Sequence, residues 1–290
     1  MSGLHIHDLS VSYAKRRVLV SLEAGPLPRG QITALLGPNG SGKSTLLRTL
    51  AGLTHAQHGA LSLDGETLAL SAANARSHSV VYLPQALPAG VRLQVLESVL
   101  VACRATRRAS LRPRHMNDVS HVSHASPTSP TSPARHPNDV EQAHAVLQRL
   151  GIDTLASRSL DELSGGQRQL VGIAQALVRD PQVLLLDEPL SALDLNHQFH
   201  VMQVLRDVTR ERGIVTVVVM HDINTAMRTC ERAMLLHGGR IVHFGAPEQV
   251  VTPASLAEVF GVVARIEPCS RGQHQVLIDG LADRTGIASH

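Results

Sequence analysis

The stretch Leu36-Gly37-Pro38-Asn39-Gly40-Ser41-Gly42-Lys43-Ser44-Thr45 decides the fold of this chain. An apolar run over 32–36 leads into it and indicates a buried strand, and residues 46–50 after it indicate a helix. A glycine-rich loop between a strand and a helix is typical of a phosphate-binding P-loop, whose N–H groups turn inward. The stretch therefore predicts a site for the phosphates of a nucleotide, formed by Gly37, Pro38, Asn39, Gly40, Ser41, Gly42, Lys43, Ser44 and Thr45.

Two side chains of this loop have the chemistry that such a site needs. Lys43 carries a positive charge for the β- and γ-phosphates, and the Ser44 hydroxyl is a ligand for Mg²⁺. The alternative is an ordinary glycine-rich turn before a helix. The strand and helix on either side favour the nucleotide site.

Two carboxylates end a second apolar run. Asp187 and Glu188 follow the run 183–186, which predicts another buried strand. Ligands of open α/β sheets bind at the carboxyl ends of the strands, so we expect these residues near the P-loop. Asp187 is a candidate Mg²⁺ ligand, and Glu188 is the candidate general base for an attacking water. The alternative is an acidic turn without a catalytic role.

A second helix start also offers groups for a phosphate. Ser164-Gly165-Gly166 combines a hydroxyl with flexible backbone N–H groups at the predicted start of a helix. Taken by itself, this would be an ordinary helix cap. Two phosphate-binding helix starts in one chain favour two halves of a composite site.

The remaining pattern favours an α/β fold. Continuous apolar runs alternate with helical segments, which is typical of a parallel sheet with both faces covered. Residues 4–22 alternate instead and predict two antiparallel strands, with prolines at 26 and 28 marking the approach to the next strand. A helix is expected over 253–260 behind a Thr252 cap, followed by one or two strands within 262–280.

Composition excludes several classes of protein. The chain has 290 residues, a net charge of +3, three scattered cysteines and no tryptophan. The charge is too small to indicate nucleic acid, and the cysteine spacing indicates no disulfide framework or metal site. No apolar run approaches the roughly 18 residues of a membrane span, and we expect a cytoplasmic protein.

Residues 110–137 interrupt the globular pattern. Their centre, 126–133, is a Ser/Thr/Pro repeat that predicts a disordered surface insertion, flanked by near-copies of one short segment. The arginines that precede the repeat fit a solvated face, or contact with anionic headgroups or an acidic partner.

These motifs together resemble the ATP-binding cassette (ABC) ATPases, the motor subunits of ABC transporters, over residues 2–260. Gly37 to Thr45 resembles the Walker A loop, 183–188 resembles Walker B, and 163–167 matches the family signature. The resemblance assigns further roles to residues in this sequence: Gln85 in the Q-loop, Asp194 in the D-loop, His221 as the switch histidine, and Tyr13 against the adenine.

The resemblance also implies an architecture. We expect a P-loop NTPase fold with a RecA-like parallel-sheet core, an antiparallel β subdomain and a helical subdomain. The ATPase domain would cover 1–250, with the helical subdomain at about 87–165 and a short extension at 251–290.

Its implied cofactors are ATP and Mg²⁺, with Ser44, Gln85 and Asp187 at the metal. A head-to-tail homodimer would place Ser164, Gly165, Gly166 and Gln167 on the partner's ATP. Partners would be integral membrane permease subunits and, indirectly, an extracytoplasmic substrate-binding protein, but not nucleic acid. The chain would lie peripherally on the cytoplasmic face of the inner membrane.

Segments 193–198 and 219–224 are similar to the importer ATPases for iron–siderophore, haem and cobalamin. Leu190 and Leu170 depart from the commoner threonine and arginine, and neither is a phosphate-contacting position. The alternatives are an ABC transporter ATPase for another substrate, including an exporter, a soluble ABC protein acting on DNA or ribosomes, and a regulatory subunit without activity.

Overall fold

The computed structural model describes residues 2–14, 16–68, 79–85, 92–110 and 137–282. Most of the predicted insertion at 110–137 and the last eight residues lie outside this part. The chain divides into two compact units, one made of Met1–Leu87 with Pro181–His290 and one made of Pro88–Asp180.

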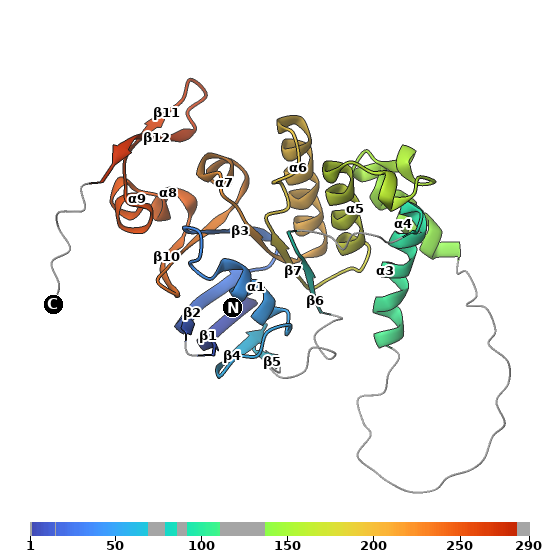
Figure 1. Cartoon of the computed structure of the whole chain (residues 1–290), viewed down its shortest axis with the longest axis horizontal. Coiled ribbons are helices and arrows are strands. Elements are labelled where there is room, and N and C mark those ends of the chain that lie inside the picture. The colour runs from blue at the N-terminus through green and yellow to red at the C-terminus, as the bar shows by residue number, and fades with distance from the viewer. Residues whose placement is uncertain (1, 15, 69–78, 86–91, 111–136, 283–290) are drawn as a thin grey trace, which may run out of the picture. The chain divides into compact units, whose positions relative to one another are not determined.

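A six-stranded sheet forms the centre of the first unit (Figure 1). Its strand order is β10-β9-β3-β8-β7-β6, with every pair parallel except β9 and β10. Strands β7 and β8 are buried throughout, which explains their continuous apolar sequences. The bounds are β3 Gln31–Leu36, β6 Val80–Leu83, β7 Val183–Asp187, β8 Val215–Val219, β9 Arg232–His237 and β10 Arg240–Gly245.

A four-stranded antiparallel sheet shares its core with the central sheet. One buried cluster joins Leu4 and Leu22 to Leu35, Leu47 and Leu185. The fully buried members of this cluster are aliphatic side chains together with Met234. The antiparallel strands are β1 Gly3–Tyr13, β2 Arg16–Pro28, β4 His58–Leu63 and β5 Glu66–Leu68.

Strand β2 extends further than the sequence indicated. The prolines at 26 and 28 suggested a connection, but the strand runs through both of them. Because β2 is the edge strand of the order β2-β1-β4-β5, a missing backbone N–H costs it no ladder partner on its open side.

Five helices and a hairpin complete the described part of the first unit. Thr252 caps α9 with a capping box, as predicted. The hairpin packs on α9 and α7, and the Asn224 side-chain amide of α7 exchanges two hydrogen bonds with the backbone of Val276 in β12. The elements are α1 Lys43–Leu50, α6 Leu195–Arg212, α7 Ile223–Thr229, α8 Pro247–Val250, α9 Pro253–Phe260, β11 Val262–Pro268 and β12 His274–Leu281. Helix α8 was not predicted.

The second unit is helical. Helices α3 (Val95–Ser110), α4 (Pro137–Arg149) and α5 (Gly165–Leu177) contact one another and bury aliphatic side chains. Two short 3-10 helices, η1 (Asp153–Leu155) and η2 (Leu160–Glu162), lie between α4 and α5 in sequence. This unit runs to Asp180, beyond the boundary expected near residue 165, and so includes all of α5. No helix in the described residues is long and apolar enough to cross a bilayer.

Candidate functional site

The loop between β3 and α1 is shaped by glycines that other residues could not replace. Gly42 precedes α1 with φ 110°, and Gly37 has φ 153°. A Cβ at Gly37 would lie 2.3 Å from the backbone oxygen of Leu236 on β9. The loop therefore holds its conformation only with glycine at these positions.

Lys43 folds back into this loop. Its ammonium donates to the backbone oxygens of Gly37 at 2.7 Å and Pro38 at 3.0 Å, and its side chain is almost fully buried. Burial lowers the pKa of Lys43, while the charges of Glu188 and Asp187 act in the opposite direction. Among the described residues, the buried Ser41 hydroxyl finds no hydrogen-bond partner. An ammonium and an unsatisfied hydroxyl in a glycine-rich loop before a helix suit a phosphate.

Asp187, at the end of β7, is held between two hydroxyls. Its Oδ1 accepts from Ser44 Oγ at 3.2 Å, and its Oδ2 accepts from the Tyr82 hydroxyl at 3.0 Å. Arg48 Nε donates to the same Tyr82 oxygen at 3.4 Å. Burial is the main cause that raises the pKa of Tyr82, so the phenol keeps its proton at neutral pH.

Glu188 brings three of the predicted residues together. Its Oε1 lies 2.5 Å from His221 Nε2, and its Oε2 accepts from Gln85 Nε2 at 2.7 Å. The Glu188 backbone has φ 51°, in the left-handed region that non-glycine residues rarely adopt. Ser191 donates its hydroxyl to the Glu188 carbonyl oxygen at 3.1 Å. A pocket of about 140 Å³ is lined by Glu188, Ser191, His221 and their neighbours.

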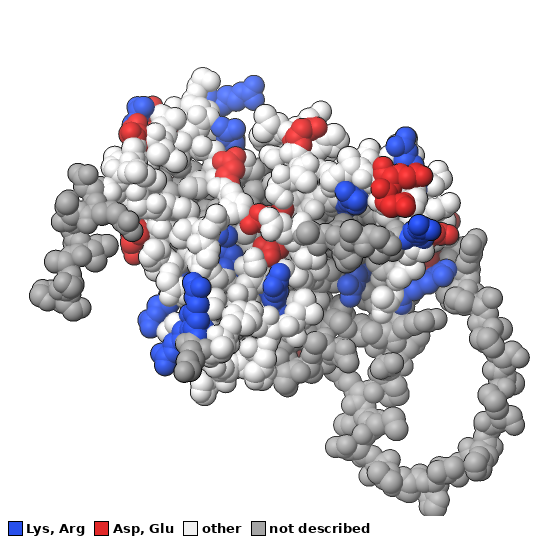
Figure 2. Space-filling model, in the orientation of Figure 1, with Lys and Arg blue, Asp and Glu red and all other residues white. Residues whose placement is uncertain are grey.

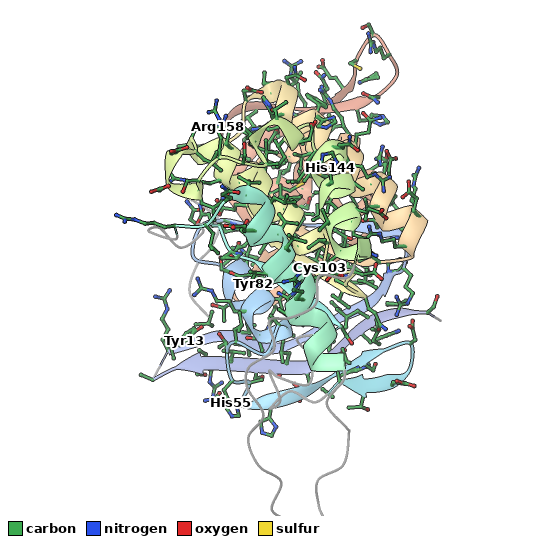
Figure 3. All side chains as sticks on the ribbon, turned by 90° about the vertical axis from the view of Figure 1, so that its right-hand side faces the viewer. Tyr13, His55, Tyr82, Cys103, His144 and Arg158 are labelled. Atoms are coloured by element: carbon green, nitrogen blue, oxygen red, sulfur yellow. The ribbon has the colours of Figure 1, made fainter. Side chains whose placement is uncertain are left out.

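Two other predicted residues of this unit lie at helix and strand ends. Tyr13, at the end of β1, is half exposed, and its hydroxyl lies 3.4 Å from Thr54 Oγ1 (Figure 3). Figure 2 shows basic side chains over the β1–β2 sheet, a charge that favours an anionic ligand. Asp194 is the N-cap of α6, and the hydrogen bond from the His197 backbone N–H is the main cause that lowers its pKa.

The predicted second phosphate site lies in the helical unit. Ser164 is the N-cap of α5 and forms a reciprocal capping box with Gln167. A Cβ built at Gly165 meets no atom within 4 Å in the described residues. Packing within this part of the chain therefore does not require glycine at that position.

Comparison with known proteins identifies the family. The sequence model of the ABC transporter family matches residues 24–191, more than half of the chain. The chain belongs to the ABC transporter family. It is 35% identical to the hemin import ATP-binding protein HmuV of Bordetella avium, over 95% of this chain and 98% of that protein. It is 33% identical to the achromobactin transport ATP-binding protein CbrD of Dickeya dadantii, over 92% of this chain and 91% of that protein.

A solved structure agrees with these relatives. A metal-chelate type ABC transporter in an inward-facing conformation matches with a TM-score of 0.72 at 26% identity, over 99% of this chain and 100% of that one. The predicted ABC family, its fold and its ATPase activity are therefore confirmed, and this chain is an ATP-binding subunit of an ABC transporter.

Sequence reasoning missed one residue of this ABC site. Tyr82 was not predicted as a site residue, but its hydroxyl donates to Asp187 Oδ2. A signal was present, because a tyrosine near the end of an apolar run, three residues before Gln85, lies at the edge of the sheet where ligands bind. The pattern did not show that the β6 strand of Tyr82 pairs directly with β7.

Proposed function

We propose that this ABC subunit hydrolyses ATP to drive the import of an iron chelate or haem through separate membrane permease subunits. The hydrolytic part rests on the Glu188 carboxylate, which contacts His221 and Gln85 and whose charge acts to raise the pKa of Lys43 in the phosphate-binding loop. The proposal that the transported substrate is an iron chelate or haem rests on the names of the relatives.

The nucleotide would bind at the loop Gly37, Pro38, Asn39, Gly40, Ser41, Gly42, Lys43, Ser44 and Thr45. Lys43 would exchange its two backbone acceptors for phosphate oxygens, and the Ser41 hydroxyl would gain a partner. Tyr13 would pack against the adenine, since half of its surface is available.

Mg²⁺ would be held by Ser44, Gln85 and Asp187. A hydroxyl, an amide oxygen and a carboxylate are the hard oxygen ligands that Mg²⁺ prefers, and two of these residues already meet at 3.2 Å. When bound, the ion would neutralise charge on the phosphate oxygens.

Glu188 would take the proton from the attacking water. Both of its oxygens are engaged in the structure, one by His221 and one by Gln85. Catalysis therefore requires one of these side chains to turn toward the nucleotide, which would free a carboxylate oxygen. This gives His221 and Gln85 a role in coupling hydrolysis to the arrival of ATP.

A homodimer would complete the site. Ser164, Gly165, Gly166 and Gln167 of one subunit would bind the ATP held by the other, with Asp194 near the shared interface. The open space at Gly165 supports this, because it leaves the helix start accessible to a ligand from another chain.

The remaining partners follow from a transport role. Integral membrane permeases would hold the dimer at the cytoplasmic face of the inner membrane, and an extracytoplasmic substrate-binding protein would deliver the cargo. The hemin import and achromobactin transport relatives and the metal-chelate transporter structure support a metal chelate.

The test is a pull-down of tagged protein from detergent-solubilised membranes. We expect a multi-span permease and, after mild cross-linking, an exported binding protein that takes up haem or an iron–siderophore. A binding protein that takes up neither would contradict the cargo. A permease alone, with transport outward in reconstituted vesicles, would contradict import.

A further inference from the structure

Tyr82 reaches Asp187 because of the strand register. In the parallel pair of β6 and β7, Tyr82 lies opposite Leu185, two residues before Asp187. Residues two apart share one face of a strand and are about 6–7 Å apart, a span that a phenol side chain covers. The 3.0 Å hydrogen bond from the Tyr82 hydroxyl to Asp187 Oδ2 therefore rests on backbone pairing and not on a flexible loop.

The two oxygens of Asp187 differ in what holds them. Oδ1 faces Ser44, a residue whose hydroxyl would turn to the metal when Mg²⁺ binds. Oδ2 faces Tyr82, which has no role as a ligand in the proposed site. With Mg²⁺ bound at Ser44 and Asp187, the Tyr82 hydroxyl would still hold Oδ2 and so fix the orientation of the carboxylate.

Arg48 supports Tyr82 from helix α1. It lies four residues after Ser44, so both side chains project from the same face of that helix. Its Nε donates to the Tyr82 oxygen at 3.4 Å, which leaves the phenolic hydrogen for Asp187. Figure 3 shows Tyr82 beside α1, in agreement with this contact.

We propose that Tyr82 is a positioning residue that orients Asp187 for magnesium-dependent binding of ATP, with Arg48 holding the Tyr82 hydroxyl in place. The inference rests on the proposed nucleotide site and adds to it a role for two residues outside the loop. Partners that orient a metal ligand typically contribute about 10–100-fold to metal affinity.

The test compares Tyr82→Phe with the unaltered full chain. The phenyl ring keeps its packing, so only the hydroxyl is lost. Thermal stabilisation by a non-hydrolysable ATP analogue is titrated with Mg²⁺, and analogue binding is also measured in EDTA. We expect the half-saturating Mg²⁺ concentration to rise about 10-fold or more, while binding in EDTA stays unchanged because the loop is intact.

Two further variants separate positioning from general stability. Arg48→Gln, at an exposed position, should also raise the Mg²⁺ concentration needed for half-saturation. If Tyr82→Phe fails to fold, this variant tests the positioning role instead. Thr216→Val, in strand β8, removes a buried hydroxyl that lies 2.7 Å from the Thr209 hydroxyl of α6. It should lower the melting temperature without changing the Mg²⁺ requirement.

An unchanged Mg²⁺ requirement in Tyr82→Phe, or in Arg48→Gln where the first variant does not fold, would overturn the positioning role. A shift of equal size in Thr216→Val would also overturn it. If the analogue does not stabilise even the unaltered chain, the proposed nucleotide site fails instead, so the two failures are distinguishable.

Discussion

Within the proposed nucleotide site, Lys43 is the residue whose loss should weaken nucleotide binding most. Its ammonium is the buried cation of the loop, and no neighbouring side chain in the described residues replaces it at the Gly37 and Pro38 oxygens. A buried charge that loses its counterpart typically costs about 2–5 kcal/mol in binding.

Lys43→Ala should therefore weaken ATP binding by about 30-fold or more and abolish hydrolysis. Arg240→Ala is the matched control, because it removes an exposed positive charge from β10 in the same unit and should leave both unchanged. Binding is measured by equilibrium dialysis and hydrolysis by phosphate release. Full turnover by Lys43→Ala would contradict the loop assignment.

The residues of the site differ in how far the sequence could predict them. The loop and the Asp187-Glu188 pair were predicted from residue types alone, because their chemistry is local to a few positions. Gln85 and His221 were predicted by family resemblance, since strand pairing and not sequence distance brings them to Glu188. Tyr82 was not predicted, because its role depends on that pairing without a motif to mark it.

At the scale of elements, Asp64 links strands β1, β2 and β4 at one end of the antiparallel sheet. It lies in the turn between β4 and β5, where it accepts from the Gly3 backbone at 2.8 Å and pairs with Arg29 at 2.6 Å. The hydrogen bond from Arg29 is the main cause that lowers the pKa of Asp64. Its contribution to stability is therefore present above the usual aspartate pKa and is lost as pH falls through the lowered pKa.

Asp64→Asn should lower the melting temperature at pH 7 and make stability less sensitive to acid below about pH 4. Melting curves from pH 7 to pH 3 measure both effects. Asp8→Asn, at an exposed position of β1, serves as the control and should follow the unaltered chain. Parallel curves for Asp64→Asn and the unaltered chain would contradict this role.

Local sequence patterns predicted most helices and strands, because each of these elements has its own apolar run or capping residue. The apolar runs of β7 and β8 and the Thr252 cap of α9 are examples. The signal failed at β2, where prolines suggested a break that an edge strand tolerates. It also failed at the four-residue α8, which is too short for a helical period to show.

For the whole molecule, the proposed dimer predicts that a trapped nucleotide holds two subunits together. Glu188→Gln keeps the loop intact but replaces the carboxylate that would accept the proton, so ATP should bind and persist. We expect sedimentation to show a dimer in ATP and a monomer in ADP. Adding Lys43→Ala to this variant should abolish the dimer, since it removes the binding site.

A Glu188→Gln protein that hydrolyses ATP at the unaltered rate would place the base elsewhere. One that retains ATP but sediments as a monomer would contradict the composite site. The sequence indicated this site through two helix starts in one chain, but their pairing between subunits lies beyond what periodicity or spacing within one chain can show.

The link between Asn224 and Val276 connects the β11–β12 hairpin to the helix that follows His221. Helix α7 begins two residues after His221. The side-chain amide of its Asn224 forms two hydrogen bonds with the Val276 backbone of β12, as a neighbouring strand would. The hairpin therefore supports the helix that follows His221, and the His221 side chain contacts Glu188. A chain shortened before this hairpin would keep every motif residue yet lose the contacts that support the helix after His221.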